Sequence, residues 1–367
     1  MKGRIIHIDT AKSWRGGQQQ AAYLHRGLIQ QGMESLMVCP PGSAMEAWCR
    51  KNNLPVHPLS LRCEADFLSA FRLTHCIKTG QSALFHAHNA HALMIALIAT
   101  VFSRKKIPVV ASRRVGFPLK LNKIAQWKYR SKKLRRIVCV SHNILRVMQF
   151  HGIPENKLAV IPSGIDIHKF DPVGRTPTFR DEWNIPRDYK IVCTIAALTA
   201  EKAYPVFLES ARLVLREYPT VIFIAVGDGK QAEEIKTLSA KKDLAGHVIF
   251  TGFRSDVGIF LKNSDLFVMA SKKEGLGTSI LDAEAAGLPV IGTDAGGIPE
   301  VIRHEVNGII VPRQNPEALA KAIVTLLKND DLRKQYGKKS LEVVKGFDIE
   351  ITIKKHIVLY EEIFKDN

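Results

Sequence analysis

The chain has 367 residues, 46% of them hydrophobic, and a formal net charge of +18. This length and apolar content suit two domains of ordinary size, each with a sizeable core. The six cysteines form no C-x-x-C pair, so neither a zinc site nor a disulfide scaffold is indicated.

The chain also shows no signal for secretion or membrane insertion. Its first residues lead straight into a predicted strand, so no signal peptide is expected. The longest largely apolar run, residues 92–102, is interrupted only by Thr100 and is too short to span a bilayer. Scattered cysteines in apolar surroundings suit a reducing cytoplasm. We therefore expect a cytoplasmic protein.

In the first half, predicted strands alternate with helices, which indicates a parallel sheet. A strand at residues 4–9 is followed by Gly16 and Gly17, which turn into a helix that ends before Gly32. A later helix is expected to begin at His142. The other predicted strands cover residues 35–39, 83–88, 108–112, 136–141 and 158–162.

The second half repeats the pattern. Residues 169–188 contain three prolines and are predicted to connect the two domains. Helices are expected at residues 205–217, after the turn of Gly227 and Gly229, after the turn at residues 275–277, and from Pro316 onward. The predicted strands cover residues 190–196, 221–227, 248–252, 266–270, 289–293 and 308–311.

Gly16 with Gly17, and Gly227 with Gly229, place one glycine-rich strand-to-helix turn in each half. Such turns are common in α/β proteins for backbone reasons alone. Both are expected at the carboxyl ends of parallel strands, where ligands of doubly wound folds collect. We therefore include these four glycines among the candidate donor-binding residues.

The segment 271–291 is the most informative part of the chain. Two acids lie eight positions apart, about two helical turns, so they can address two parts of one ligand. The free N–H groups at the start of the intervening helix form an anion site that suits a phosphate. An ordinary amphipathic helix after a glycine turn is the alternative. The candidate residues are Glu274, Gly275, Leu276, Gly277, Thr278, Ser279 and Asp282.

The positive charge is concentrated in one region. No Asp or Glu occurs from Phe67 to Pro154, where 16 Lys and Arg lie, and residues 104–136 are the densest part. Phe117, Trp127 and Tyr129 lie among them. Three interpretations are open: contact with an anionic membrane surface or phosphorylated lipid acceptor, a solvated basic face, or nucleic acid. No nucleic-acid motif accompanies the charge, so no nucleic acid is expected.

The acid segment resembles the Glu-x7-Glu signature of retaining glycosyltransferases with the GT-B fold, especially glycosyltransferase family 4. The segments 251–254 and 292–300 are similar to that family as well, and 161–166 resembles its "IPNGVD" segment. The resemblance covers almost the whole chain. It implies two Rossmann-like α/β domains whose parallel sheets face each other across a cleft: an acceptor domain at 1–168, a sugar-nucleotide domain at 169–345, and a helix at 346–367 that crosses back to the first domain.

The resemblance also implies residue roles in the second domain. The first acid, Glu274, lies at the donor sugar, and Asp282 lies at the ribose, where its shorter side chain makes the contact longer or water-bridged. Lys202 matches the lysine of a family segment like "GRL-x-x-x-KG" that binds the donor diphosphate. Ala197 stands where the family has arginine. The residues that can supply the missing charge are Arg254, Lys272 and Lys273.

In the first domain, the family often has a histidine after the strand at 108–112, and Arg114 occupies that position here. Because adjacent guanidinium groups bind phosphate or carboxylate as bidentate forks, Arg113 and Arg114 indicate an anionic acceptor. His86 and His88 resemble the family's "HAH" segment. We assign His86 to the acceptor and His88 to catalysis. Backbone-satisfied histidines at a strand end are the alternative, and no metal is expected.

These observations together predict a retaining, metal-independent glycosyltransferase. It would move a sugar from a nucleotide-diphosphate sugar to an envelope or lipid-linked glycan, such as a lipopolysaccharide-type acceptor, while peripherally associated with the membrane. Lys202 and the helix N-terminus would stabilise the diphosphate, and Glu274 would hold the sugar. The chain has no Asp-x-Asp motif, and no cofactor is expected. The alternatives are a GT-B sugar-nucleotide epimerase or hydrolase, and a non-enzymatic anion-binding protein.

Overall fold

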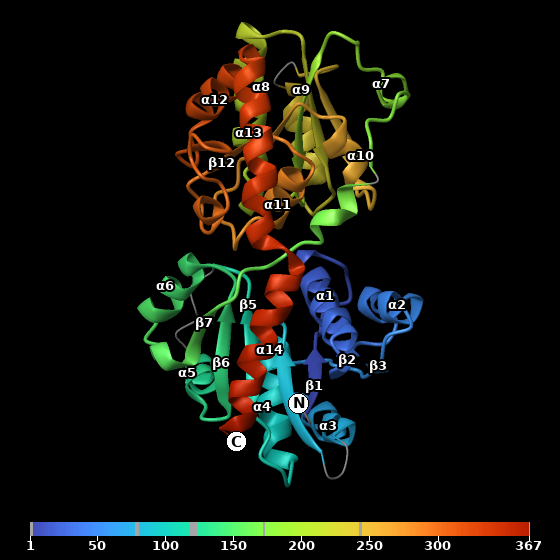
Figure 1. Ribbon diagram of the computed structural model, residues 1–367, viewed down its shortest axis with the longest axis vertical. Helices are drawn as coiled ribbons and strands as arrows, with labels where there is room; N and C mark the ends of the chain where they lie inside the picture. The colour runs from blue at the N-terminus through green and yellow to red at the C-terminus, as the bar shows by residue number, and fades with distance from the viewer. Residues whose placement is uncertain (1–2, 78–80, 117–122, 172, 242–243, 367) are drawn as a thin grey trace. The chain divides into compact units, whose positions relative to one another are not determined.

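The computed structural model describes residues 3–77, 81–116, 123–171, 173–241 and 244–366. The chain forms two compact units (Figure 1). Unit 1 comprises residues 1–164 and 349–367, and unit 2 comprises residues 165–348. Part of the predicted basic window, residues 117–122 with Phe117 and Lys120, lies outside the described residues. The assignment of residues 1–168 to acceptor binding and of residues 169–345 to donor binding stays a proposal.

Unit 1 is built on a sheet of seven described strands in the order β3-β2-β1-β4-β5-β6-β7, all of them parallel. Its strands are β1 Gly3–Ile8, β2 Glu34–Cys39, β3 Val56–Pro58, β4 Ser82–Ala87, β5 Val109–Arg113, β6 Leu134–Cys139 and β7 Leu158–Val160. Its helices are α1 Gly16–Gln30, α2 Ala44–Lys51, α3 Phe67–Leu73, α4 Ala90–Phe102, α5 Lys123–Arg130, α6 His142–Phe150 and α14 Ile349–Lys365, with short 3-10 turns at Thr74–Cys76 and Glu155–Lys157.

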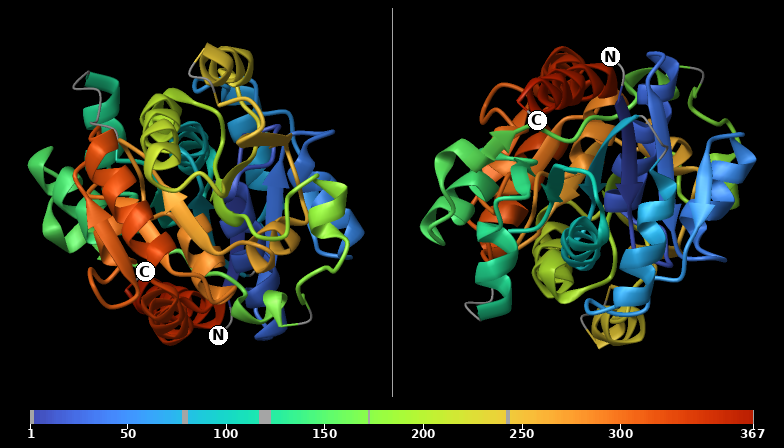
Figure 2. Two further views of the ribbon diagram at one scale, coloured as in Figure 1. Left: turned by 90° about the horizontal axis from the view of Figure 1, so that it is seen from above. Right: turned by 90° about the horizontal axis from the view of Figure 1, so that it is seen from below.

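Helices cover both faces of this sheet, which is why its central strands are apolar on both sides. The last helix, α14, packs against α1, and a Cβ on Gly27 of α1 would lie 2.1 Å from Cδ1 of Ile353. Seen from below, α14 in red and α4 in teal lie on opposite sides of the sheet (Figure 2). The expected return of the final helix to the first domain is confirmed.

Unit 2 has a sheet of six described strands in the order β10-β9-β8-β11-β12-β13, again all parallel. Its strands are β8 Lys190–Ile195, β9 Val221–Val226, β10 Val248–Gly252, β11 Leu266–Met269, β12 Val290–Thr293 and β13 Gly308–Val311. Its helices are α7 Phe179–Glu182, α8 Tyr204–Glu217, α9 Ala232–Lys241, α10 Val257–Lys262, α11 Thr278–Ala285, α12 Pro316–Lys328 and α13 Asp330–Val343. Short 3-10 turns lie at η3 Ile167–Phe170, η4 Ala200–Lys202, η5 Ile298–Glu300 and η6 Val344–Phe347.

The predicted parallel α/β architecture is confirmed, and most strand boundaries agree within one or two residues. β3 was not predicted, because its three residues Val56–Pro58 are too short to give an alternating pattern. Within the described part of the chain, no helix is both long enough and apolar enough to cross a bilayer.

The predicted connection at residues 169–188 is part of the core of unit 2 instead. Phe170 and Phe179 are buried there, and the ring of Phe179 packs edge-on against Phe260 with centroids 5.5 Å apart. This segment therefore packs on unit 2, and its buried phenylalanines anchor it there.

Candidate functional site

Four loops of unit 2 lie side by side at the edge where its parallel strands end, which we call the carboxyl edge. Ala196 after β8 donates its N–H to Val226 O at 3.0 Å, and Leu198 donates to Asp228 O at 3.1 Å. The loop after β11 joins them, since the Lys272 N–H donates to Glu201 O at 2.9 Å. The unit 2 turns predicted to bind the donor thus lie together, whereas Gly16 and Gly17, also predicted at the donor, belong to unit 1.

Two glycines make this assembly possible. Gly227 has φ +143°, and a Cβ on it would lie 2.1 Å from Ala196 O. Gly296, in the loop after β12, has φ +59°, and its Cβ would lie 1.9 Å from Glu274 O. No L side chain fits either position. Gly229 packs in the same way against the backbone of Leu198.

Glu274 lies at the centre of these loops and forms an ion pair with Lys202. Both side chains are only partly exposed, at 15% and 21%. The carboxylate also lies 3.2 Å from the Gly275 N–H and 3.4 Å from Ser271 Oγ. The structure therefore brings together the two unit 2 residues that we assigned to catalysis.

The N-terminus of α11 lies directly after this carboxylate. Its N-cap, Gly277, has φ +98° and offers no side-chain cap. Ile280 N–H donates to Gly277 O at 2.9 Å, whereas the first N–H groups of a helix, here those of Thr278 and Ser279, have no intrahelical acceptor. The Leu276 side chain is buried and anchors the turn. This is the local geometry of an anion site.

Asp282, one turn further along α11, is paired with Lys169 of η3 at 2.6 Å. Burial raises the pKa of Asp282, and the Lys169 ammonium offsets part of that effect. The family resemblance implies that Asp282 lies at the ribose, but nothing in the sequence indicates its pairing with Lys169, which lies 113 residues away in the chain. Only the packing of η3 on α11 brings the two together.

The three candidates for the charge missing at Ala197 are in different situations. Arg254 is exposed and held by Asp256, with Nε 2.8 Å from Oδ1. Lys272 is half-buried and Lys273 exposed, and both follow β11 in the loop that contacts Glu201. Ala203, aligned with a family glycine, has φ +51°, so its backbone keeps the conformation that glycine favours.

The carboxyl edge of unit 1 carries a buried hydrogen-bonded network of histidines. His86 Nδ1 lies 2.6 Å from the Tyr360 hydroxyl, and His86 Nε2 lies 2.8 Å from Ser112 Oγ. His88 Nε2 lies 2.8 Å from His7 Nδ1. Strands β1, β4 and β5 and helix α14 each contribute to this network.

The arginine fixes the tautomers of two of these rings. Arg114 can only donate, and its terminal nitrogens lie 3.3 Å from His88 Nδ1. Neutral His88 therefore carries its proton on Nε2 and donates it to His7 Nδ1. His7 in turn carries its own proton on Nε2, a buried atom without a hydrogen-bond partner among the described residues.

Burial, with smaller contributions from neighbouring rings and Arg114, lowers the pKa of His7, His86 and His88 well below the usual range for histidine. Burial also lowers the pKa of Arg114 to about 10. The rings are thus neutral and the guanidinium is charged at neutral pH. Both nitrogens of His88 are engaged, so this geometry suits a residue that orients Arg114 better than a general base.

His7, His86 and His88 each offer a nitrogen within 4.8 Å of the others, which is a possible metal-binding spacing. The contacts of His86 with Tyr360 and Ser112, and those of His88 with His7 and Arg114, engage both nitrogens of each of these two rings, and the guanidinium would repel a cation. The donor set fits a hydrogen-bonded network better than a metal centre.

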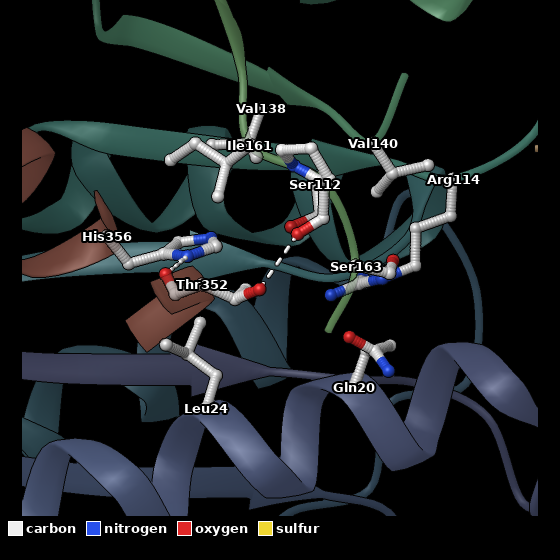
Figure 3. A pocket seen from close by; sticks show the side chains of 11 residues that line it. Gln20, Leu24, Ser112, Arg114, Val138, Val140, Ile161, Ser163, Thr352 and His356 are labelled. Carbon is white, nitrogen blue, oxygen red and sulfur yellow. Dashed lines mark hydrogen bonds between the residues drawn. The ribbon is translucent and has the colours of Figure 1, made fainter. Parts of the chain in front are cut away.

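Arg114 also lines a small cavity in unit 1 that reaches the last helix (Figure 3). About 10 Å³ of this cavity is open to water, which is room for one molecule. His356 Nδ1 donates to Thr352 O at 2.8 Å. Among the described residues, His356 Nε2 and Arg114 Nε are buried without a hydrogen-bond partner.

Gly16 and Gly17 begin α1 next to this arginine. A Cβ on Gly17 would lie 3.8 Å from Arg114 Cδ, and the N-cap Arg15 makes no side-chain capping bond. Arg113, by contrast, interacts with the Tyr129 hydroxyl. The structure thus groups Gly16, Gly17, His88 and Arg114 and directs Arg113 elsewhere.

Sequence reasoning missed Asp9 at the end of β1. Its buried carboxylate accepts from Ala11 N–H at 2.8 Å, Gln18 Nε2 at 3.0 Å and Asn89 Nδ2 at 3.3 Å. Its charge also favours the ionised form of Arg114. The available signal was an acid at the carboxyl end of a buried strand; its partners lie up to 80 residues away.

Two known protein families together match almost the whole chain. The family described as Glycosyltransferase Family 4 matches residues 14–169, and the family described as Glycosyl transferases group 1 matches residues 175–343.

Individual proteins show the same similarity. The chain is 23% identical over 376 residues to the Escherichia coli UDP-Gal:alpha-D-GlcNAc-diphosphoundecaprenol alpha-1,3-galactosyltransferase, covering 98% of this chain and 97% of the relative. A solved glycosyltransferase from Rickettsia africae has a TM-score of 0.86 and 21% identity, with both chains fully covered. Anabaena HepE in complex with UDP and glucose has a TM-score of 0.83 and 19% identity, covering 98% of this chain and 99% of the other.

Proposed function

The chain belongs to glycosyltransferase family 4, a retaining family of nucleotide-sugar transferases with the GT-B fold, and we propose that it transfers a sugar to an anionic envelope or lipid-linked glycan without a metal ion. The E. coli relative and the Anabaena complex both carry UDP in their names. UDP-sugars are therefore the first donors to test.

The observation that carries the proposal is the Lys202–Glu274 ion pair beside the uncapped N-terminus of α11. Breaking the donor's glycosidic bond leaves negative charge on the diphosphate and positive charge on the sugar. Lys202 and the amides of Thr278 and Ser279 supply positive potential for the first, and Glu274 supplies negative charge for the second. When the donor enters, its phosphate replaces Glu274 as a partner of Lys202, which frees the carboxylate to hold sugar hydroxyls.

Asp282 is assigned to the ribose hydroxyls of the donor. In this role Lys169 is a positioning residue, because its ammonium opposes the rise that burial causes in the pKa of half-buried Asp282 and fixes the carboxylate. An ionised carboxylate accepts hydrogen bonds from a diol more strongly than a neutral acid does. Gly227 and Gly229 bring the backbone of the neighbouring turn close enough to face the same ligand.

The acceptor is assigned to unit 1. Arg114 supplies the positive charge. Gly16 and Gly17, which we expected at the donor, lie next to it at the α1 N-terminus, and we reassign them to the acceptor. We revise the role of His88 from catalysis to orientation of Arg114, since its Nδ1 accepts from that guanidinium. A phosphate or carboxylate on the acceptor would bind there. The E. coli relative is named for a diphosphate-linked acceptor, which agrees with this chemistry.

The proposal is tested by Glu274→Gln. Its transfer rate from UDP-sugars should fall about 10²–10³-fold, the usual effect of removing a group that stabilises transition-state charge. The matched controls are Glu233→Gln and Lys236→Met, which break an exposed ion pair in the same unit. Unchanged turnover in Glu274→Gln would refute the assigned role.

Two further measurements separate the alternatives. Chelator treatment should leave the rate unchanged if Lys202 and α11 replace a metal, and loss of activity would overturn metal independence. Turnover of labelled UDP-sugar without any acceptor would instead identify an epimerase or hydrolase. Binding of donors is followed by thermal shift, because a ligand of the native state raises its apparent stability.

A further inference from the structure

Five large apolar side chains of unit 1 are exposed on two neighbouring helices. Phe67, Leu68 and Phe71 of α3 and Val101 and Phe102 of α4 are between 42% and 75% exposed. We call them the α3–α4 apolar patch. The rings of Phe71 and Phe102 meet edge-on with centroids 5.9 Å apart, so the two helices contribute to one continuous surface.

The packing of α3 explains why these residues face outward. Ser69, Ala70 and Leu73 form its buried side. Helical spacing then places Phe67, Leu68 and Phe71 on the opposite side. A helix that exposes three large apolar residues on its outer side contradicts the usual amphipathic pattern. Contiguous exposed apolar surface of this kind marks an interaction site.

The patch lies away from the proposed site. α4 begins after β4, at the carboxyl edge that holds His88, and runs back along the sheet to Phe102. Phe102 therefore lies toward the opposite edge, where β5 begins at Val109. Changes in the patch should leave the donor and acceptor residues undisturbed.

Most of the charges beside the patch are positive. Exposed Arg72 lies on the outward side of α3, and residues 104–106, Arg-Lys-Lys, follow Phe102 after Ser103. Two acids, Glu64 and Asp66, precede Phe67 at the N-terminal end of the patch, and both are engaged: Asp66 caps α3 through the Ser69 N–H at 3.0 Å, and Glu64 lies 3.7 Å from Lys128 Nζ. No acid occurs between residues 67 and 154.

This combination decides between possible occupants. Two copies of the chain would bring like charges together, because each carries a formal net charge of +18. An anionic bilayer offers phosphates to the basic residues and hydrocarbon to the aromatic ones. Stable attachment of a peripheral protein needs two such signals together.

We propose that the α3–α4 apolar patch inserts into an anionic bilayer while Arg72 and residues 104–106 contact the lipid phosphates. This proposal rests on the proposed function in one respect: attachment to the bilayer holds the enzyme where a lipid-linked acceptor lies. It extends that function by naming the element that enters the bilayer, in addition to the charge that attracts it.

The test is co-flotation with phosphatidylcholine vesicles with and without phosphatidylglycerol. Phe71→Ser with Phe102→Ser should weaken binding to the anionic vesicles about tenfold or more, since two large apolar contacts are lost. The control is Leu341→Ser with Val358→Ser, two exposed apolar residues on α13 and α14, which should bind like the wild type. All variants should keep the wild-type melting temperature.

A second variant tests the charge. Arg104→Gln with Lys105→Gln and Lys106→Gln should reduce the preference for phosphatidylglycerol and the sensitivity of binding to salt. Wild-type protein that ignores anionic vesicles, or patch variants that bind them equally well, would overturn the proposal. A wild-type dimer that becomes monomeric on loss of the patch would also overturn it, in favour of a contact between copies.

The two proposals fail independently. If vesicle binding is absent but Glu274→Gln still loses transfer to a soluble acceptor, the bilayer surface is wrong and the enzyme assignment stands. If Glu274→Gln transfers normally while the patch variants lose the vesicles, the enzyme assignment is wrong and the bilayer surface stands.

Discussion

The carboxyl edges of the two units hold their charged side chains in different ways. In unit 2, acids and lysines form ion pairs on loops, Lys202 with Glu274 and Lys169 with Asp282. In unit 1, neutral histidines lie around Arg114, whose charge the Asp9 carboxylate favours. Both edges belong to parallel sheets, so the difference arises from the side chains and not from the topology.

The difference indicates what each edge can exchange with a ligand. When a donor binds, an ion pair can separate so that each partner contacts a different part of the donor, because the diphosphate and the sugar hydroxyls replace the lost contacts. The histidines have no charge to exchange, and they hold Arg114 in place. We therefore interpret unit 2 as an edge that rearranges on binding and unit 1 as one that is rigid before binding.

The largest expected effect comes from exchanging the unit 2 pair. Lys202→Glu combined with Glu274→Lys restores opposite charges but reverses their order. Transfer should fall about 10²–10³-fold, whereas the melting temperature should lie closer to wild type than in either single variant. Kinetic and thermal measurements check this together. Retained activity would mean that the pair acts only in folding.

The next largest effect is expected at low pH, where unit 1 should lose stability before unit 2. Folding lowers the pKa of His7, His86 and His88 in unit 1. Their contribution to the stability of unit 1 is therefore present above the pKa of an unfolded histidine, about 6.5. It is lost as the pH falls below that pKa, by about 1.4 kcal/mol per pH unit for each proton bound on unfolding. Glu284 in unit 2, whose pKa burial raises well above normal, has the opposite trend. Hydrogen exchange at decreasing pH should show β4 losing protection before β11; simultaneous loss would contradict the contrast.

A smaller effect should follow from Tyr360→Phe. The change removes the hydroxyl 2.6 Å from His86 Nδ1 and leaves a buried nitrogen without its partner, which costs about 1–3 kcal/mol. Denaturant unfolding measures the loss, with Tyr336→Phe in the core of unit 2 as the control. Equal stability in the two variants would show that the network does not hold α14.

The smallest effect is expected at Glu284. Its Oε1 accepts from Asn307 Nδ2 at 2.7 Å, and its Oε2 has no hydrogen-bond partner among the described residues. Because its pKa is raised on folding, its contribution to stability is present at low pH and is lost as the pH rises. Glu284→Gln should therefore stabilise the protein by about 1 kcal/mol at alkaline pH, and the gain should shrink in acid. Melting curves across this range check the sign.

Much of the fold could be read from local patterns. Buried strands such as β9 and β11 are continuous apolar runs, and glycines at 227 and 277 mark the turns that follow strands. The acid pair and the glycine turns of unit 2 were found in the same way, because they lie within short segments, whereas Lys202 was assigned by resemblance to a family segment. The segment 169–188 was misread, since its prolines suggested a linker and its buried phenylalanines were not weighed.

The sequence by itself determined the alternation of strands and helices, the acid-bearing turn and the concentration of positive charge. These depend on neighbours within a few residues, where spacing dictates geometry. Only the tertiary structure decided that Lys169 pairs with Asp282, that Tyr360 reaches His86, and that α3 exposes its aromatic side. Those outcomes join residues up to 274 positions apart, and packing of whole elements, which no local pattern encodes, brings them into contact.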